Sequence, residues 1–434
     1  MDGGQIMDIR RNLYRLSAAA VTQLTDALNT LKNDGRYDGY IHLHHEAMMR
    51  PSLMPGEAGT GRNSAHMGPA FGPWHRRYLR DLELDLQTVV PGITLPYWDW
   101  ATDAATPNPT AAPLWSTPYF GGDGAGPNDV VPNGPFTGWT ALLMQSGGSM
   151  TLVPRSFPGL VRQLARAGIA TLPRGLDVTS CLQESPYDSA PWSEAAMPSF
   201  RNRLEGWLFR AGDQTGPRMH NRVHVWVGGD MQFGTSPNDP VFFLHHANVD
   251  RLWAKWQASA GAAAYAPISG GPPGHNLNDA MFDLGAPGTT PASVLDHYRM
   301  GYMYDSEGVG FEADACGPTP MLTVARGQMV QIMACYTNTG TTAWTKGTAT
   351  QVNLGQFTPA PFFAPWATGW LSNSDYATTT TALVAPGQMG YFVFAVTPPA
   401  STAPGQYTLE GELILAGTRR PLLAPTFSQQ ITVQ

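Results

Sequence analysis

The chain has 434 residues, of which 42% are hydrophobic and 14% are charged, and its formal net charge at pH 7 is -7. This length allows two domains with sizeable cores, while the negative charge argues against nucleic acid as a partner. No apolar run approaches the roughly eighteen residues that span a bilayer, so we expect no membrane association. No secretory leader is recognisable, which favours a cytoplasmic over a secreted location.

Helices dominate the first part of the chain. Apolar residues recur at three- and four-residue spacing over residues 21–31, and a stronger helix is expected over residues 74–86. Further helices are predicted at residues 200–209, 239–257 and 292–300. Between them lie tracts rich in Pro, Gly, Asn and Asp, which predict long irregular segments at residues 104–136, 145–198 and 261–291.

The pattern changes from helical to alternating at about Pro320. Short runs with alternating apolar residues at 328–336, 391–396 and 407–415 are separated by turn signals such as Pro-Gly. This spacing favours an antiparallel β-sandwich of about a hundred residues. Residues 305–319, rich in Gly, acidic residues and Pro, are the expected linker.

Three cysteines are too few for a disulfide framework. Composition alone favours free thiols in a reducing compartment. The alternative is a single bridge between Cys316 and Cys335.

Nine of the eleven histidines fall into two clusters, and the second cluster contains His220, His224, His245 and His246. His220 and His224 are four residues apart, so on a helix both imidazoles project from one face and can bind one metal ion. Adjacent residues on a helix point about 100° apart, so only one of His245 and His246 should provide the third ligand. His246 is favoured because Asp250, four residues later, shares its face and could orient its imidazole.

The first cluster contains His42, His44, His45, His66 and His75. His66 and His75 are nine residues apart, so a bend has to bring them together. For the third position, His44 shares a predicted helix face with apolar residues, whereas His42 lies with acidic neighbours on the polar face. We therefore predict His44 as the ligand and His42 as a solvated residue.

Two sets of three histidines without carboxylate ligands favour a pair of redox-active metal ions over a single zinc ion. Imidazole suits copper well. Reduction of dioxygen to peroxide takes two electrons, and each copper(I) ion can give only one. We therefore predict two copper ions per chain, with O2 as a co-substrate.

The motifs around these histidines resemble the tyrosinase family of type 3 copper proteins, in particular its compact bacterial members. The resemblance covers about residues 8–304. The matching stretches are YDGYIHLH (37–44), RNSAHM (62–67), PWHRRYL (73–79), LPYWDW (95–100), HNRVH (220–224), NDPVFFLHHANVDR (238–251) and GYMY (301–304).

The resemblance implies a copper-dependent enzyme that hydroxylates monophenols at the ortho position and oxidises o-diphenols to o-quinones. It implies a mainly α helical-bundle catalytic domain (1–304) that holds the dicopper site. An all-β antiparallel sandwich domain (320–434) of immunoglobulin-like type would follow the linker. Carried over residue by residue, the copper ligands would be His44, His66 and His75 for one ion, and His220, His224 and His246 for the other.

Four further residues match positions around the substrate in the family. Glu205 and Asn221 correspond to the pair thought to hold the water that deprotonates the phenol, although Glu205 could instead be a helix-surface carboxylate. Val225 stands where some members have Arg, and Phe242 could stack on the bound ring. Ser64 replaces the cysteine that fungal and plant relatives cross-link to a histidine, so we expect no thioether.

The C-terminal domain has no histidine, so it cannot ligate copper through imidazole. Its aromatic residues are expected mainly in the sandwich core. Alternatively, an aromatic residue from segment 359–370 covers the active site, or the domain binds a protein partner. Three other functions fit the histidine clusters: a catechol or o-aminophenol oxidase, an oxygen carrier of hemocyanin type, and a dizinc hydrolase.

Overall fold

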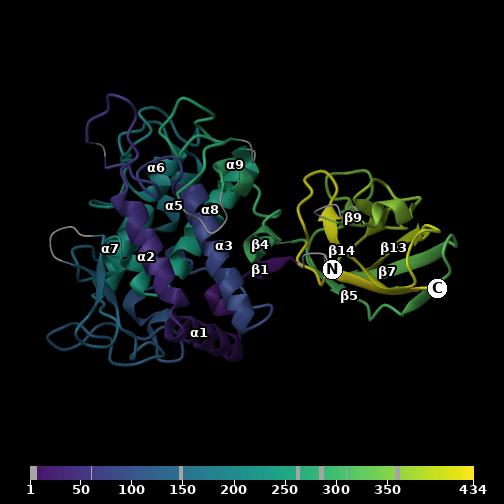
Figure 1. Ribbon diagram of the computed structural model, residues 1–434, viewed down its shortest axis with the longest axis horizontal. Coiled ribbons are helices and arrows are strands. Elements are labelled where there is room, and N and C mark those ends of the chain that lie inside the picture. The colour runs from purple at the N-terminus through teal and green to yellow at the C-terminus, as the bar shows by residue number, and fades with distance from the viewer. Residues whose placement is uncertain are drawn as a thin grey trace. The chain divides into compact units, whose positions relative to one another are not determined.

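The computed structural model describes residues 7–59, 61–145, 150–260, 264–282, 288–308, 310–356 and 362–434. The chain divides into two compact units, drawn in Figure 1. The N-terminal unit comprises residues 10–296, and the C-terminal unit comprises residues 1–9 and 297–434. Within the described ranges, no helix has the length and apolar character that a membrane span requires.

Helices α2, α3 and α8 form the centre of the N-terminal unit (Figure 1). Helix α3 packs against α8 and also against α1, and α7 packs against α8. The α-helices of the described residues are α1 (Ala18–Asn33), α2 (Arg36–Met49), α3 (Phe71–Val89), α4 (Trp100–Ala104), α5 (Gly175–Leu182), α6 (Phe200–Glu205), α7 (Met219–Val227), α8 (Val241–Ala260) and α9 (Pro291–Val294). A short hairpin joins β2 (Leu142–Met144) to β3 (Leu152–Pro154).

A buried ion-pair network ties the start of this unit to its central helices. Arg10 donates to Glu83 of α3 at 2.9 Å and to Asp250 of α8 at 3.4 Å. Arg76 donates to the other oxygen of Asp250 at 2.6 Å. Because every one of these charges is removed from water, breaking one partner would leave an uncompensated buried charge.

The prediction of a mainly α helical bundle is wrong. Several helices are only one or two turns long, and long irregular segments make up most of the chain between them. The helix predicted at 200–209 ends at Glu205, because Gly206 takes a left-handed φ of 114°. The helix predicted at 292–300 is the short α9. Local apolar periodicity therefore overestimated the helix content.

Two sheets form the C-terminal unit. One has the strand order β10-β13-β7-β5 and the other β11-β9-β14-β15-β6. The strands are β4 (Tyr302–Tyr304), β5 (Ala313–Ala315), β6 (Leu322–Val324), β7 (Val330–Asn338), β8 (Trp344–Thr345), β9 (Val352–Gly355), β10 (Ala367–Thr368), β11 (Asp375–Thr378), β12 (Leu383–Val384), β13 (Met389–Val396), β14 (Gly405–Leu415) and β15 (Phe427–Val433).

The sandwich is not purely antiparallel, which corrects the second half of the predicted fold class. Strand β15 pairs in parallel with β6, with Ile431 opposite Leu322 and Val433 opposite Val324. The N-terminal segment also joins this unit, since β1 (Asp8–Arg10) pairs with β4, and the Asp8 N–H donates to Gly301 O at 2.9 Å. Such pairings between distant segments have no signal in local sequence periodicity.

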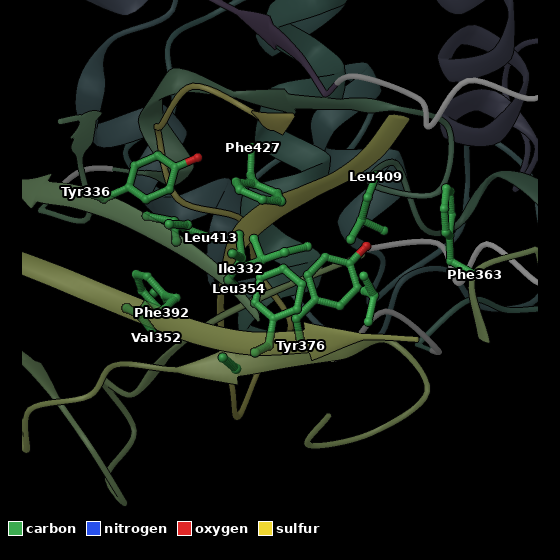
Figure 2. Close-up of a cluster of buried hydrophobic side chains, with 14 of the residues drawn as sticks. Ile332, Tyr336, Val352, Leu354, Phe363, Tyr376, Phe392, Leu409, Leu413 and Phe427 are labelled. Carbon is green, nitrogen blue, oxygen red and sulfur yellow. The ribbon is translucent and has the colours of Figure 1, made fainter. Parts of the chain in front are cut away.

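Alternating side chains of both sheets fill the space between them (Figure 2). Ile332 and Tyr336 of β7 and Phe392 of β13 meet Leu354 of β9 and Leu413 of β14. These side chains are almost fully buried. The period-two pattern noticed in the sequence is therefore the inward face of each strand.

A disulfide joins Cys316, next to the end of β5, to Cys335 of β7. The expectation of free thiols is thus wrong for these two residues, whereas Cys181 is free and buried. The two cysteines can form a disulfide because antiparallel pairing of β5 with β7 places their α-carbons 5.4 Å apart.

The segment predicted to cover the active site, 359–370, lies partly outside the described residues. Within the described part, Phe363 and Trp366 are buried in the C-terminal unit's own core. Trp370 donates its indole N–H to Ala395 O at 2.8 Å. Only Phe362, which is 54% exposed, retains much accessible surface among these aromatic residues.

Candidate metal centre

Three imidazole nitrogens of the second cluster converge on one point. The Nε2 atoms of His220 and His224 on α7 lie 3.0 Å apart, and Nε2 of His246 on α8 lies 3.2 and 3.3 Å from them. Helical spacing places His220 and His224 on the same side of α7, and the packing of α7 against α8 brings in His246.

The protonation state of the His220 and His224 rings leaves their Nε2 atoms available to bind a metal ion. His224 Nδ1 lies 2.6 Å from Met231 O and His220 Nδ1 lies 3.3 Å from Glu205 O. Carbonyl oxygens only accept, so Nδ1 carries the proton and Nε2 presents a lone pair. Two lone pairs at 3.0 Å repel, whereas nitrogens bound at about 2 Å to one tetrahedral ion lie roughly 3.3 Å apart. The donor set therefore fits a metal.

His245 is the fourth histidine of this group, and one of its ring nitrogens lies within 4.8 Å of a ring nitrogen of each of the others. It is fully buried and stacks on His220, with ring centroids 5.1 Å apart. Neither of its ring nitrogens has a hydrogen-bond partner among the described residues. The geometry thus brings together all four histidines of the cluster.

The first cluster draws its histidines from α2, from the loop before α3 and from α3. His44 Nδ1 lies 2.8 Å from Gly234 O, and His75 Nδ1 lies 2.8 Å from Phe71 O. Their Nε2 atoms are buried without a partner among the described residues. His66 is held by Asn63, whose side-chain oxygen accepts its backbone N–H at 2.9 Å. These three histidines form a second group of potential metal ligands.

The two groups face each other. His75 stacks on His246 with ring centroids 4.4 Å apart, and the His66 and His220 centroids are 6.2 Å apart. His42 of α2, by contrast, is exposed to solvent. The histidines that the sequence divided into two clusters therefore form a single site with two donor sets.

Burial keeps these imidazoles neutral. Desolvation lowers the pKa of His44 to about 3 and that of His224 to about 4, and it lowers the pKa of His75 and His246 well below the ordinary value. A neutral imidazole has a free lone pair at pH 7, which metal coordination requires.

A cavity of about 660 Å³ opens onto both donor sets. Its walls include Glu205, Asn221 and Val225, together with His66 and His220. Phe242 is not among the lining residues. It is fully buried and stacks on the His246 ring at a centroid distance of 4.0 Å.

Glu205 is a buried residue and not a surface carboxylate. One of its oxygens accepts the Met67 backbone N–H at 2.6 Å, and the other accepts from the Arg201 guanidinium at 3.0 Å. Burial raises the pKa of Glu205, while the positive charge of Arg201 opposes that shift. Asn221 lies beside it along the cavity wall and leaves its buried amide nitrogen without a partner among the described residues.

Two arginines donate hydrogen bonds to Asp250. Its oxygens accept from Arg76 and Arg10, as described above, and Nδ1 of His246 has no hydrogen-bond partner among the described residues. Sequence reasoning missed these arginines, and also the carbonyls of Met231 and Gly234 that orient the ligands. Backbone acceptors carry no side-chain signal that a sequence could reveal.

Comparison with known proteins finds relatives that match most of the N-terminal unit. A family model described as the common central domain of tyrosinase matches residues 34–259. A tyrosinase of Streptomyces antibioticus is 39% identical over 303 residues, which are 69% of this chain and 100% of that relative. A grixazone synthase of Streptomyces griseus subsp. griseus is 35% identical over 319 residues, with the same two coverages.

A solved structure shares the fold. A polyphenol oxidase variant from Thermothelomyces thermophila has a TM-score of 0.51 and 22% sequence identity, covering 69% of this chain and 88% of its own.

Proposed function

Because the chain belongs to the tyrosinase family, we propose that it hydroxylates monophenols at the ortho position and oxidises o-diphenols to o-quinones with O2. It is accordingly a copper-dependent oxidoreductase that acts on phenols. The observation that carries this proposal is the pair of facing histidine sets, both of which contribute residues to the lining of one cavity.

Six histidines are proposed to hold two copper ions. His44, His66 and His75 would bind one ion, and His220, His224 and His246 the other. The unpartnered Nε2 atoms of His44 and His75 and the converging Nε2 atoms of the second set support this assignment. Copper bound there would supply the one-electron steps that couple phenol oxidation to reduction of O2.

The protein's own groups would bind and deprotonate the phenol. Glu205 and Asn221 are proposed to hold, between the carboxylate and the amide, the water that accepts the phenol proton. The unpartnered amide nitrogen of Asn221 supports this role, as does the shared position of both residues on the cavity wall. Val225 would contact the substrate. Phe242 would not contact the substrate; it would fix the orientation of the His246 ring by stacking on it.

Metal analysis of matched variants tests the ligand assignment. Purified, copper-loaded wild type should contain two copper ions per chain, and His224→Ala should lose one of them together with quinone formation. His42→Ala removes an exposed histidine of α2 and should change neither. Two zinc ions and no copper in protein purified without added metal would favour the dizinc hydrolase. Full activity in His224→Ala would refute the proposed ligand set.

Oxygen consumption distinguishes the possible reactions. Conversion of a monophenol to its o-quinone uses one O2 per quinone and releases one water, whereas oxidation of an o-diphenol uses half an O2 per quinone. We expect the first ratio with 4-methylphenol and the second with 4-methylcatechol. Turnover of the catechol alone would indicate a catechol oxidase. Reversible O2 uptake without turnover of either compound would indicate an oxygen carrier.

For the C-terminal unit we propose either that it covers the site or that it binds a protein partner. Deleting residues 319–434 separates these roles. A cover predicts faster phenol turnover after the deletion, whereas partner binding predicts unchanged turnover.

A further inference from the structure

Two large aromatic side chains stand exposed around the cavity. Phe233 is 81% exposed and Phe209 is 59% exposed, and both line the same cavity as the histidines. Exposed apolar groups gathered at the edge of a pocket are typical of ligand-binding surfaces. The folded chain covers little of the Phe233 ring, so this ring gains almost nothing from burial, and its position at the cavity favours a ligand that would cover it.

The backbone at Phe233 strengthens this argument. Its φ of 64° lies in the left-handed region, which is unfavourable for a bulky side chain. The strain is not compensated by burial of the ring. Residues held in such conformations cluster at functional sites.

The cavity is also larger than the proposed reaction needs. Its volume of about 660 Å³ lies within the range of about 300–1,000 Å³ that holds drug-sized ligands. A single phenol ring positioned over the histidines fills only part of it. The remaining space extends to the rim formed by Phe209 and Phe233.

The residues that line the described cavity include no Lys or Arg that could pair with an ionic substituent. Apart from the histidines, Glu205 is the only ionisable residue among those lining the described cavity. A cation beside the rim is Arg218, whose guanidinium lies 3.4 Å from the centroid of the Phe209 ring. Arg218 also bonds to Gly216 O and lies 3.9 Å from Asp213.

We propose that the physiological substrate is an uncharged phenol with a second ring or similarly large apolar group in the para position, which packs against Phe233 and Phe209. This inference rests on the proposed oxidation of phenols and specifies its substrate class. The reacting ring would lie at the histidines and the second ring at the rim. Burying that second ring would replace water around both phenylalanines and tighten binding.

Three catechols test the proposal, because their oxidation does not depend on the hydroxylation step. 4-Benzylcatechol should have a kcat/KM about tenfold above that of 4-methylcatechol. The difference should come from a lower KM, since burial of an additional ring favours binding. 3-(3,4-Dihydroxyphenyl)propionate, which is anionic, should show no such gain. Phe233→Asn should abolish the preference by making kcat/KM for 4-benzylcatechol equal to that for 4-methylcatechol in the same variant, because Asn tolerates a positive φ but lacks the apolar ring.

Matched variants make the test specific. Phe233→Trp should retain the preference, and so should Leu176→Ala, which truncates a 75% exposed apolar residue of α5 outside the cavity lining. Equal kcat/KM values for the benzyl and methyl catechols in wild type would overturn the proposal, as would a preference that survives in Phe233→Asn.

Calorimetric titration with diphenylmethane measures binding to Phe209 and Phe233 independently of oxidation, because this compound has no hydroxyl group to oxidise. Binding to the copper-loaded wild type that weakens about tenfold in Phe233→Asn would support the rim even if no catechol were oxidised. Failure to oxidise 4-methylcatechol would refute the proposed function alone. Equal affinity of the wild type and Phe233→Asn for diphenylmethane would refute the proposed binding of an apolar group by Phe233.

Discussion

Gly206 lies directly against the backbone of Arg218: a β-carbon at position 206 would lie 2.2 Å from the Arg218 carbonyl oxygen. The same β-carbon would lie 3.1 Å from Cβ of Asn221. This close approach brings the end of α6, with Glu205, against the start of α7, with Asn221. Only glycine combines the required space with the φ of 114° found there.

Gly206→Ala should therefore destabilise the protein and disturb the Glu205–Asn221 pair. Gly212→Ala is the matched control, because Gly212 also has a positive φ of 85° but a β-carbon added there would meet no atom within 4 Å. The control should cost about 1–2 kcal/mol for left-handed strain alone, and Gly206→Ala about 1–3 kcal/mol more. Urea unfolding measures both. Equal losses would show that the contact with Arg218 contributes nothing.

Glu205→Gln should reduce monophenol hydroxylation about a hundredfold, the lower limit for loss of a proton-transfer group, and change o-diphenol oxidation far less. An o-diphenol is more acidic at its first hydroxyl group and depends less on an assisting base. Initial rates with 4-methylphenol and 4-methylcatechol measure the two reactions. Glu184→Gln is the control, since Glu184 also pairs with an arginine but does not line the cavity. Parallel losses in both reactions would contradict the proton-transfer role.

Reduction of the Cys316–Cys335 disulfide should selectively destabilise the C-terminal unit. The bridge closes a loop of 19 residues, for which chain entropy gives a stabilisation of about 3 kcal/mol. Cys316→Ser with Cys335→Ser should lower the unfolding temperature of that unit and leave the copper content at two ions per chain. Cys181→Ser, at the free cysteine, is the control for the effect of serine substitution. An unchanged thermal transition in the double variant would be evidence against a stabilising bridge.

Glu412 should make the stability of the C-terminal unit depend on pH. Burial raises the pKa of this β14 carboxyl group from 4.5 to about 7, so the folded state retains a proton that the unfolded state releases. The free energy of unfolding should then fall by about 3 kcal/mol as the pH rises from 4.5 to 7. Urea unfolding at pH 5 and pH 8 measures this change.

Glu412→Gln should remove most of this pH dependence, because its side chain does not titrate. Asp314→Asn, at an exposed carboxylate of β5, should preserve it. A wild-type stability that rises between pH 5 and pH 8 would contradict the expected direction.

The sequence by itself indicated which side chains share a helix face. His220 and His224 face the same way on α7, and on α2 His44 is buried while His42 is exposed. The motifs around these histidines also pointed to the family that the comparisons establish. Such features are encoded within a few consecutive residues, where helical geometry fixes the relation between neighbours.

Only the tertiary structure decided how distant segments meet. It brought His75 against His246, buried Glu205 beneath Met67 and Arg201, and left Phe233 exposed at the cavity rim. It also paired the N-terminal strand β1 with β4, and β6 in parallel with β15. Contacts of this kind depend on packing and chain closure over many residues, which local periodicity does not encode.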